Sequence, residues 1–119
     1  MRFAGKIISG RGVGRELGFP TLNFELAENW KIEPGVFAAR LFFDEKTFPA
    51  ILFFGNRETF DGKKALEIHV LGEFSESPTA AEFEILDKIR EVAKFENSKK
   101  LVAQIEKDCA VAREILGVR

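Results

Sequence analysis

The sequence predicts a mainly β protein, a small closed or nearly closed β-barrel that ends in one α-helix. Short stretches rich in aromatic and β-branched residues follow one another through most of the chain, separated by Gly, Pro and Asp turn signals. An amphipathic helical pattern comes last. The 119 residues suffice for one core, and no repeat or linker divides them, so we expect a single domain over residues 1–119.

Strand patterns occupy the middle of the chain. Residues 36–43 are aromatic and branched, and residues 48–54 predict their hairpin partner, with Pro49 acceptable near a strand start or on an edge. Residues 66–71 show the clearest alternation, with Leu, Ile and Val sharing one face. Residues 81–90 fit a strand and a helical stripe alike, so the pattern leaves their structure open.

The last segment predicts an amphipathic helix that covers the core. Asn97 or Ser98 can cap its start and Gly117 its end. The lone cysteine excludes an internal disulfide, and we expect it to be a buried apolar group rather than a nucleophile. The apolar face consists of Leu101, Ile105, Cys109, Ala112, Ile115 and Leu116.

Composition argues against several classes of partner. The net charge is −1 and the pI is about 5.9, so no global basic field indicates a nucleic-acid partner. The longest apolar run, residues 50–54, is too short to cross a bilayer, and the first residues lack the apolar stretch of a signal peptide. We therefore expect a cytoplasmic protein that binds neither nucleic acid nor membrane. We also expect a monomer, although nothing in the composition determines the oligomeric state.

A glycine- and arginine-rich stretch near the N-terminus leads into a conformationally restricted segment. Residues 10–18 hold four glycines and two arginines, and Pro20 restricts the backbone just before Thr21. Thr21 and Asn23 are two residues apart, so their side chains share one face of an extended segment. A hydroxyl and an amide oxygen beside such a loop suit a phosphate with its magnesium. The alternative is a glycine-rich surface turn before an ordinary strand.

The alternating segment at residues 66–71 has two polar candidates on its second face. Glu67 is an uncommon choice inside a strand, and the alternative to a catalytic role is a solvated outer-face residue. His69, the only histidine, could orient a ligand or the carboxylate, or be an ordinary surface or core residue. No second His or Cys offers a metal cluster, and neither a Gly-x-Ser-x-Gly elbow nor a Walker A ending is present.

Together these motifs resemble the signature of the riboflavin kinase (flavokinase) family. The resemblance spans nearly the whole chain in the family's order. It begins with Gly10-x-x-x-Gly14-Arg15-x-Leu17-Gly18-Phe19-Pro20-Thr21-x-Asn23 and continues through Pro34-Gly35-Val36-Phe37-Ala38, Arg57-x-Thr59-Phe60, Leu66-Glu67-Ile68-His69-Val70, Ile89-Arg90-Glu91, Lys94-Phe95 and Leu101-Val102-Ala103-Gln104-Ile105-x-Lys107-Asp108.

The resemblance implies a six-stranded Greek-key β-barrel with a C-terminal α-helix. It also implies transfer of the ATP γ-phosphoryl group to the 5′-hydroxyl of riboflavin, giving FMN and ADP. Glu67 would be the general base, and Arg90 and Phe95 would lie on the flavin side. Thr21 and Asn23 would hold Mg²⁺. The residues implied to contact ATP or its phosphates are Gly10, Arg11, Gly12, Gly14, Arg15, Pro20, Thr21 and Asn23.

Several positions depart from the family's pattern. Phe53 stands where an Asn is expected, Glu58 replaces a Pro, residues 73–79 lack a Tyr-Gly, and Val92 replaces a carboxylate. We expect these departures to lie away from the metal and base residues, and to affect flavin affinity or the identity of the acceptor. A barrel that binds flavin or nucleotide without turnover is therefore the alternative function. An OB-like nucleic-acid barrel fits poorly, because the pI is acidic and no basic-aromatic stripe is present.

Many bacterial members of the family have this domain behind an adenylyltransferase domain that makes FAD. The predicted barrel of this chain begins almost at Met1. We therefore expect the kinase activity without the adenylyltransferase activity. A stand-alone kinase and the kinase half of a bifunctional enzyme both remain open.

Overall fold

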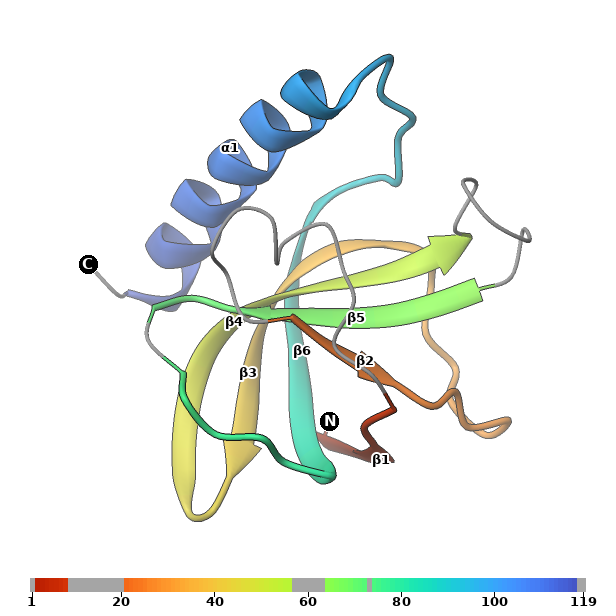
Figure 1. Ribbon diagram of the computed structural model, residues 1–119, viewed down its shortest axis with the longest axis vertical. Coiled ribbons are helices and arrows are strands. Elements are labelled where there is room, and N and C mark those ends of the chain that lie inside the picture. Colours follow the sequence, from red (N-terminus) through yellow and green to blue (C-terminus); the bar gives the residue numbers. More distant parts are fainter. Residues whose placement is uncertain (1, 9–20, 57–63, 73, 118–119) are drawn as a thin grey trace.

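The computed structural model describes residues 2–8, 21–56, 64–72 and 74–117. This part of the chain is mainly β, as predicted, and ends in a helix (Figure 1). It contains no helix with the length and apolar character that a membrane span requires. The elements are β1 (Arg2–Lys6), β2 (Thr21–Phe24), β3 (Gly35–Phe43), β4 (Lys46–Asn56), β5 (Lys64–Val70), β6 (Ala80–Arg90) and α1 (Ser98–Leu116).

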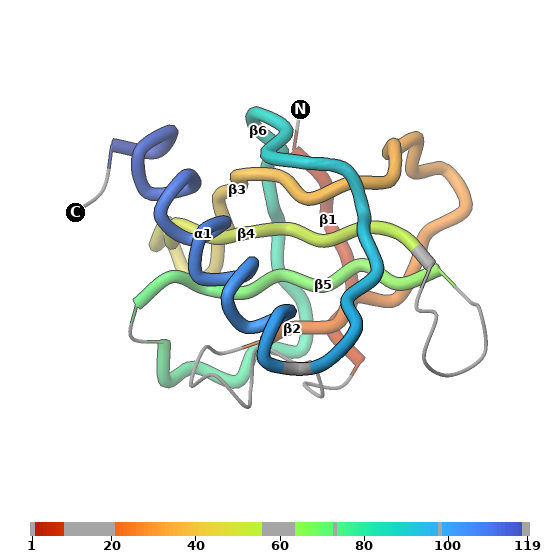
Figure 2. Tube along the Cα trace, turned by 90° about the horizontal axis from the view of Figure 1, so that it is seen from above, coloured from red at the N-terminus to blue at the C-terminus, as the bar shows by residue number. Residues whose placement is uncertain are grey.

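The six strands form one antiparallel sheet in the order β1-β6-β3-β4-β5-β2. The sheet curls, and its two edge strands approach each other (Figures 1 and 2). Just beyond β1, Ile7 forms a bridge with Phe24 of β2. Two backbone hydrogen bonds of 2.8 Å flank this bridge, from Ile8 N to Asn23 O and from Glu25 N to Lys6 O. The predicted six-stranded barrel with a C-terminal helix is confirmed.

One face of the curled sheet encloses an aromatic and aliphatic core. Phe83 lies at its centre, with its ring centroid 5.3 Å from that of Phe3, 5.1 Å from Phe24 and 5.5 Å from Trp30. A Cβ on Gly5 would lie 2.9 Å from both Phe24 and Trp30, so only glycine lets β1 approach these rings. The buried members are Leu22, Phe24, Phe37, Ala39, Leu41, Ala50, Leu52, Phe54, Leu66, Ile68, Val70, Ala81 and Phe83.

Helix α1 packs against the other, outer face of the sheet and forms a second core there (Figure 2). The predicted apolar helix face is confirmed, but it covers the outside of the sheet rather than the interior. Asn97 caps the helix by accepting a 2.9 Å hydrogen bond from Lys100 N, and Gly117 ends it with φ of 68°. The buried members are Val36, Ala38, Ile51, Leu71, Ile105, Cys109 and Ala112.

Cys109 lies inside this second core and is 2% exposed. Burial raises the pKa of its thiol above the ordinary value, which the nearby Arg113 only partly opposes. The thiol therefore stays protonated at neutral pH, and Cys109 is the buried apolar group that the sequence predicts.

Strand β6 contributes to both cores. Phe83 and Ile85 pack with the interior, whereas Leu86 and Ile89 pack with the helix. Register shifts in the pairing of β6 with β3 break the simple alternation. This irregularity explains why residues 81–90 fit a strand and a helical stripe alike.

A buried ion pair ties β6 to α1. The Nε of Arg90 donates to both carboxylate oxygens of Asp108 at 3.0 Å, and a terminal nitrogen donates to Oδ2 at 2.9 Å. Gln104 Nε2 donates to Oδ1 of the same carboxylate at 3.0 Å. Asp108 is only 2% exposed, so its charge depends on these partners.

We expect Asp108→Ala to destabilise the protein by about 3–5 kcal/mol, because it leaves the Arg90 guanidinium without its buried partner. Urea denaturation measures this loss. The matched control is Lys100→Ala, which breaks the exposed Lys100–Glu96 pair of 2.8 Å and should cost less than about 1 kcal/mol. Equal losses in the two variants would contradict a structural role for the buried pair.

Candidate active site

Strands β2 and β5 bring four polar side chains together on the outer face of the sheet. Leu22 and Phe24 point into the interior core, so Thr21 and Asn23 point outward. The antiparallel register pairs Thr21 with His69 and Asn23 with Glu67. Directly opposed side chains of such pairs lie about 4.5–5.5 Å apart at Cβ. We call Thr21, Asn23, Glu67 and His69 the polar cluster.

The polar cluster is buried. Thr21 is 5% exposed, Asn23 7%, Glu67 9% and His69 7%. The interpretation of Glu67 as a solvated outer-face residue is therefore wrong. Burying polar groups costs free energy unless they are hydrogen-bonded. Apolar side chains at these four buried positions would avoid that cost. This concentration of hydroxyl, amide, carboxylate and imidazole groups is what a functional site requires.

His69 lies between two other members of the polar cluster. Its Nδ1 is 3.1 Å from Thr21 Oγ1, within hydrogen-bonding distance. Its Nε2 is 3.9 Å from Glu67 Oε2, too far for a hydrogen bond but close enough for an electrostatic interaction. Burial lowers the pKa of His69 from 6.5 to about 4, although the Asp108 carboxylate acts in the opposite direction. The ring is therefore neutral at physiological pH.

The next strand of the sheet, β4, places apolar side chains beside the polar cluster. Phe53 pairs with Glu67, and Ile51 pairs with His69. Phe53 is one of the departures from the family's pattern, and the expectation that all of them lie away from the metal and base residues is wrong for this one. The Glu67 carboxylate thus has Asn23 on one flanking strand and an aromatic ring on the other.

The two predicted flavin-side residues lie together, at a distance from Glu67. The guanidinium carbon of Arg90 is 5.6 Å from the ring centroid of Phe95. The row that contains Glu67 continues through Phe53 and Val36 to Arg90. Three inter-strand steps of about 4.8 Å separate the backbones of Glu67 and Arg90 by on the order of 14 Å along the curved sheet.

The ion pair of Arg90 with Asp108 was not predicted. Asp108 lies on the apolar stripe of the helix, three residues after Ile105 and four before Ala112. An acid within an apolar helical stripe is a sequence signal for a buried ion pair, because a buried carboxylate needs a cationic partner.

Several predicted site residues lie outside the described part of the chain. The residues concerned are Gly10, Arg11, Gly12, Gly14, Arg15 and Pro20. The predicted metal ligands, Thr21 and Asn23, and the predicted base, Glu67, are all described, and the sheet register brings them together.

The donor set of the polar cluster fits a magnesium ion. Thr21 offers a hydroxyl oxygen, Asn23 an amide oxygen and Glu67 a carboxylate, all on one sheet face. Mg²⁺ prefers hard oxygen ligands and commonly takes one or two from the protein, with the rest from water and substrate phosphates.

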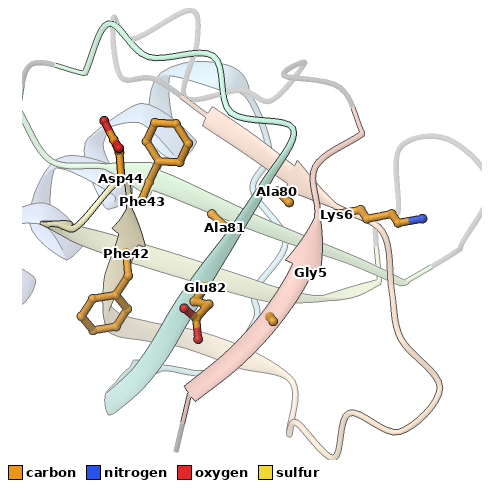
Figure 3. A pocket seen from close by; sticks show the side chains of 9 residues that line it. Gly5, Lys6, Phe42, Phe43, Asp44, Ala80, Ala81 and Glu82 are labelled. Carbon is orange, nitrogen blue, oxygen red and sulfur yellow. The ribbon is translucent and has the colours of Figure 1, made fainter.

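Two hollows of the described surface lie elsewhere. The first measures about 520 Å³ and lies over β1, β6 and the end of β3 (Figure 3). Its polar side chains, Lys6, Asp44 and Glu82, are all exposed, and Lys6 extends away from Phe42 and Glu82. A second hollow of about 250 Å³ is lined by residues of β1, β3, β6 and the segment before β3. Neither hollow includes a member of the polar cluster. The polar cluster is the better candidate site, because its polar side chains are buried together whereas those of the first hollow are exposed.

Comparison with known proteins indicates one family. The family model described as riboflavin kinase (Flavokinase) matches residues 1–116. A bifunctional riboflavin kinase/FMN adenylyltransferase from Haemophilus influenzae is 34% identical over 116 residues, covering 94% of this chain and 37% of that protein. The RNA-binding riboflavin kinase RibR from Bacillus subtilis is 31% identical over 122 residues, covering 97% of this chain and 52% of that protein. The chain thus spans only about a third to a half of these relatives.

A solved structure has the same fold. It is a crystal structure of a protein described as a macrolide-efflux protein from Streptococcus pneumoniae, with a TM-score of 0.79 and 27% sequence identity. The similarity covers 94% of this chain and 38% of that one.

The burial of His69 predicts that stability depends on pH. Its pKa is about 4 in the folded protein against an ordinary value of 6.5, so the unfolded chain binds more protons between these values. The free energy of unfolding should be highest above pH 6.5 and fall as the pH drops toward 4, by up to about 3 kcal/mol.

Urea denaturation across this pH range checks the effect, with His69→Gln as the reference that lacks the titrating ring. The parent should lose more stability than the variant as the pH falls. Parallel curves for the two proteins would contradict the assignment.

Proposed function

This chain belongs to the riboflavin kinase family, and we propose that it transfers the γ-phosphoryl group of ATP to the 5′-hydroxyl of riboflavin, giving FMN and ADP. One observation supports this most directly, the register that pairs Asn23 with Glu67 and Thr21 with His69 on one buried face. Phosphoryl transfer needs a base for the nucleophile next to a site that neutralises phosphate charge. The adenylyltransferase activity in the names of longer relatives is not part of the proposal.

Glu67 is the proposed general base. Its carboxylate takes the proton of the riboflavin 5′-hydroxyl as that oxygen bonds to the γ-phosphorus, and the bond from this phosphorus to the bridging oxygen of ADP breaks. The side chain is buried between β2 and β4, which limits the positions that the carboxylate can adopt. A fixed base needs little reorganisation when the substrate hydroxyl arrives.

Thr21 and Asn23 are the proposed protein ligands of Mg²⁺. Bound with the nucleotide, the ion would neutralise charge on the phosphate oxygens. Both side chains project from a strand whose neighbours Leu22 and Phe24 are packed in the interior core. The proposed nucleotide contacts are Gly10, Arg11, Gly12, Gly14, Arg15, Pro20, Thr21 and Asn23.

Arg90 and Phe95 are the proposed flavin-side residues. Asp108 holds the Arg90 guanidinium through a bidentate contact, and Phe95 lies beneath it. These residues are three strands away from Glu67, on the order of 14 Å along the curved sheet, and such a separation suits a substrate whose reacting hydroxyl and ring system lie at opposite ends. Riboflavin, with its ribityl chain and three-ring isoalloxazine, is such a molecule.

We also propose that the chain acts as a cytoplasmic monomer without a nucleic-acid or membrane partner. The net charge of −1 supports the absence of a nucleic-acid partner. The RNA binding named for the Bacillus subtilis relative concerns that protein, of which this chain covers 52%.

The alternative function is a barrel that binds flavin or nucleotide without turnover. Phe53 favours it, because an aromatic ring pairs with Glu67 where the family's pattern has an Asn. An assay of the purified protein with riboflavin, ATP and Mg²⁺ separates the two by FMN formation. Measurable flavin binding without FMN would favour the binding module and overturn the kinase.

We expect Glu67→Gln to lower turnover by roughly 10²–10⁴-fold, because the amide cannot accept the hydroxyl proton. Steady-state FMN formation measures the loss. Glu82→Gln is the matched control, since Glu82 is an exposed glutamate on β6 and should retain parental turnover. Unchanged turnover in Glu67→Gln would remove this carboxylate from the mechanism.

We expect Asn23→Ala to raise the Mg²⁺ concentration needed for half-maximal activity, because one proposed oxygen ligand is lost. A magnesium titration at fixed ATP measures the shift. Asn29→Ala, which alters an exposed asparagine in the segment after β2, should leave the titration unchanged. A parental titration curve in Asn23→Ala would exclude Asn23 as a ligand.

A further inference from the structure

His69 contacts one proposed magnesium ligand and lies close to the proposed base. It is 7% exposed and stands on β5 opposite Thr21, two residues from Glu67. Its Nδ1 is 3.1 Å from Thr21 Oγ1, and its Nε2 is 3.9 Å from Glu67 Oε2. Each nitrogen of the ring therefore lies near a different functional side chain.

If Glu67 is the ionised base of the proposed function, its carboxylate favours one tautomer of the ring. A neutral imidazole has one N–H donor and one acceptor nitrogen. An N–H on Nε2 is attracted to the carboxylate oxygen 3.9 Å away, whereas a lone pair there would be repelled. The favoured form has the proton on Nε2 and the acceptor on Nδ1.

This tautomer determines the orientation of the Thr21 hydroxyl. When Nδ1 is the acceptor, the Thr21 O–H donates to it across the 3.1 Å contact. The Thr21 oxygen then meets its other neighbours as an acceptor or as a cation ligand. With the opposite tautomer, an N–H on Nδ1 would donate to the Thr21 oxygen and compete with a cation for its lone pairs.

We propose that His69 is a positioning residue, which orients the Thr21 hydroxyl through Nδ1 and the Glu67 carboxylate through Nε2. This inference rests on the proposed function. His69 itself touches neither the metal nor the reacting atoms. Partners that orient a metal ligand in this way typically contribute 10–100-fold in metal affinity or activity.

Two substitutions separate the two contacts. The Oδ1 of an asparagine lies close to the position of the histidine Nδ1, and the Nε2 of a glutamine lies close to that of the histidine Nε2. His69→Asn keeps an acceptor for Thr21, so we expect near-parental Mg²⁺ dependence and a kcat lowered about 10-fold or more. His69→Gln keeps a donor for Glu67, so we expect a kcat near that of the parent at saturating Mg²⁺ and an apparent Mg²⁺ affinity about 10-fold weaker or more.

Binding of ADP with Mg²⁺, measured by calorimetry, provides a readout that does not need turnover. The Mg²⁺ dependence of this binding should weaken in His69→Gln and stay near parental in His69→Asn. A uniform loss in both variants, or no loss in either, would overturn the positioning role. If FMN forms in the parent while the two variants show no such split, the inference fails and the proposed function stands.

The parent protein allows a test without substitution, because His69 is its only histidine. In protein prepared with ¹⁵N-labelled histidine and no histidine tag, the ring nitrogen signals belong to His69 alone. We expect a protonated Nε2 and an unprotonated Nδ1, with the Nδ1 signal shifting on addition of Mg²⁺ and ADP. A proton on Nδ1 would overturn the inference, even if the substituted proteins fail to fold. If the parent forms no FMN but shows the expected tautomer and the expected difference in Mg²⁺-dependent ADP binding, the proposed kinase function fails while the orientation of Thr21 by His69 stands.

Discussion

The antiparallel register between β2 and β5 is the constraint on which the proposed site depends. Leu22 and Phe24 are packed in the interior core, and the period of two along a strand turns Thr21 and Asn23 to the opposite face. A slip of one residue would turn the polar pair into the interior core and the apolar pair to the outer face. The core thus fixes the register, and the register brings Asn23 to Glu67.

Much of the fold could be predicted, because the relevant signals are local. The alternation of residues 66–71 has the period of a strand, and the stripe from Leu101 to Leu116 has the period of a helix. The capping residues Asn97 and Gly117 follow from backbone hydrogen bonding at helix ends. The structure of residues 81–90 could not be predicted from pattern, because register shifts against β3 break the alternation and the strand serves two cores.

The candidate site was predictable within each strand and not between strands. Period-two spacing puts Thr21 with Asn23, and Glu67 with His69. Nothing local indicates that β2 pairs with β5, that Phe53 of β4 stands beside Glu67, or that Asp108 holds Arg90. Resemblance to a family supplied the association of the first two pairs, since a motif in order implies a shared site. It could not supply the place of Phe53, where this chain departs from the pattern.

Phe53 is a neighbour of both the proposed base and the helix-covered core. It flanks the proposed base on one side and pairs with Val36 of the helix-covered core on the other. An aromatic ring at this point gives Glu67 an apolar neighbour on β4, while His69 and Asn23 remain its polar neighbours on β5 and β2. One residue of β4 is therefore the strand neighbour of both the proposed base and the helix-covered core. The polar cluster and the second core therefore meet at Phe53, which pairs with Glu67 on one side and with Val36 on the other.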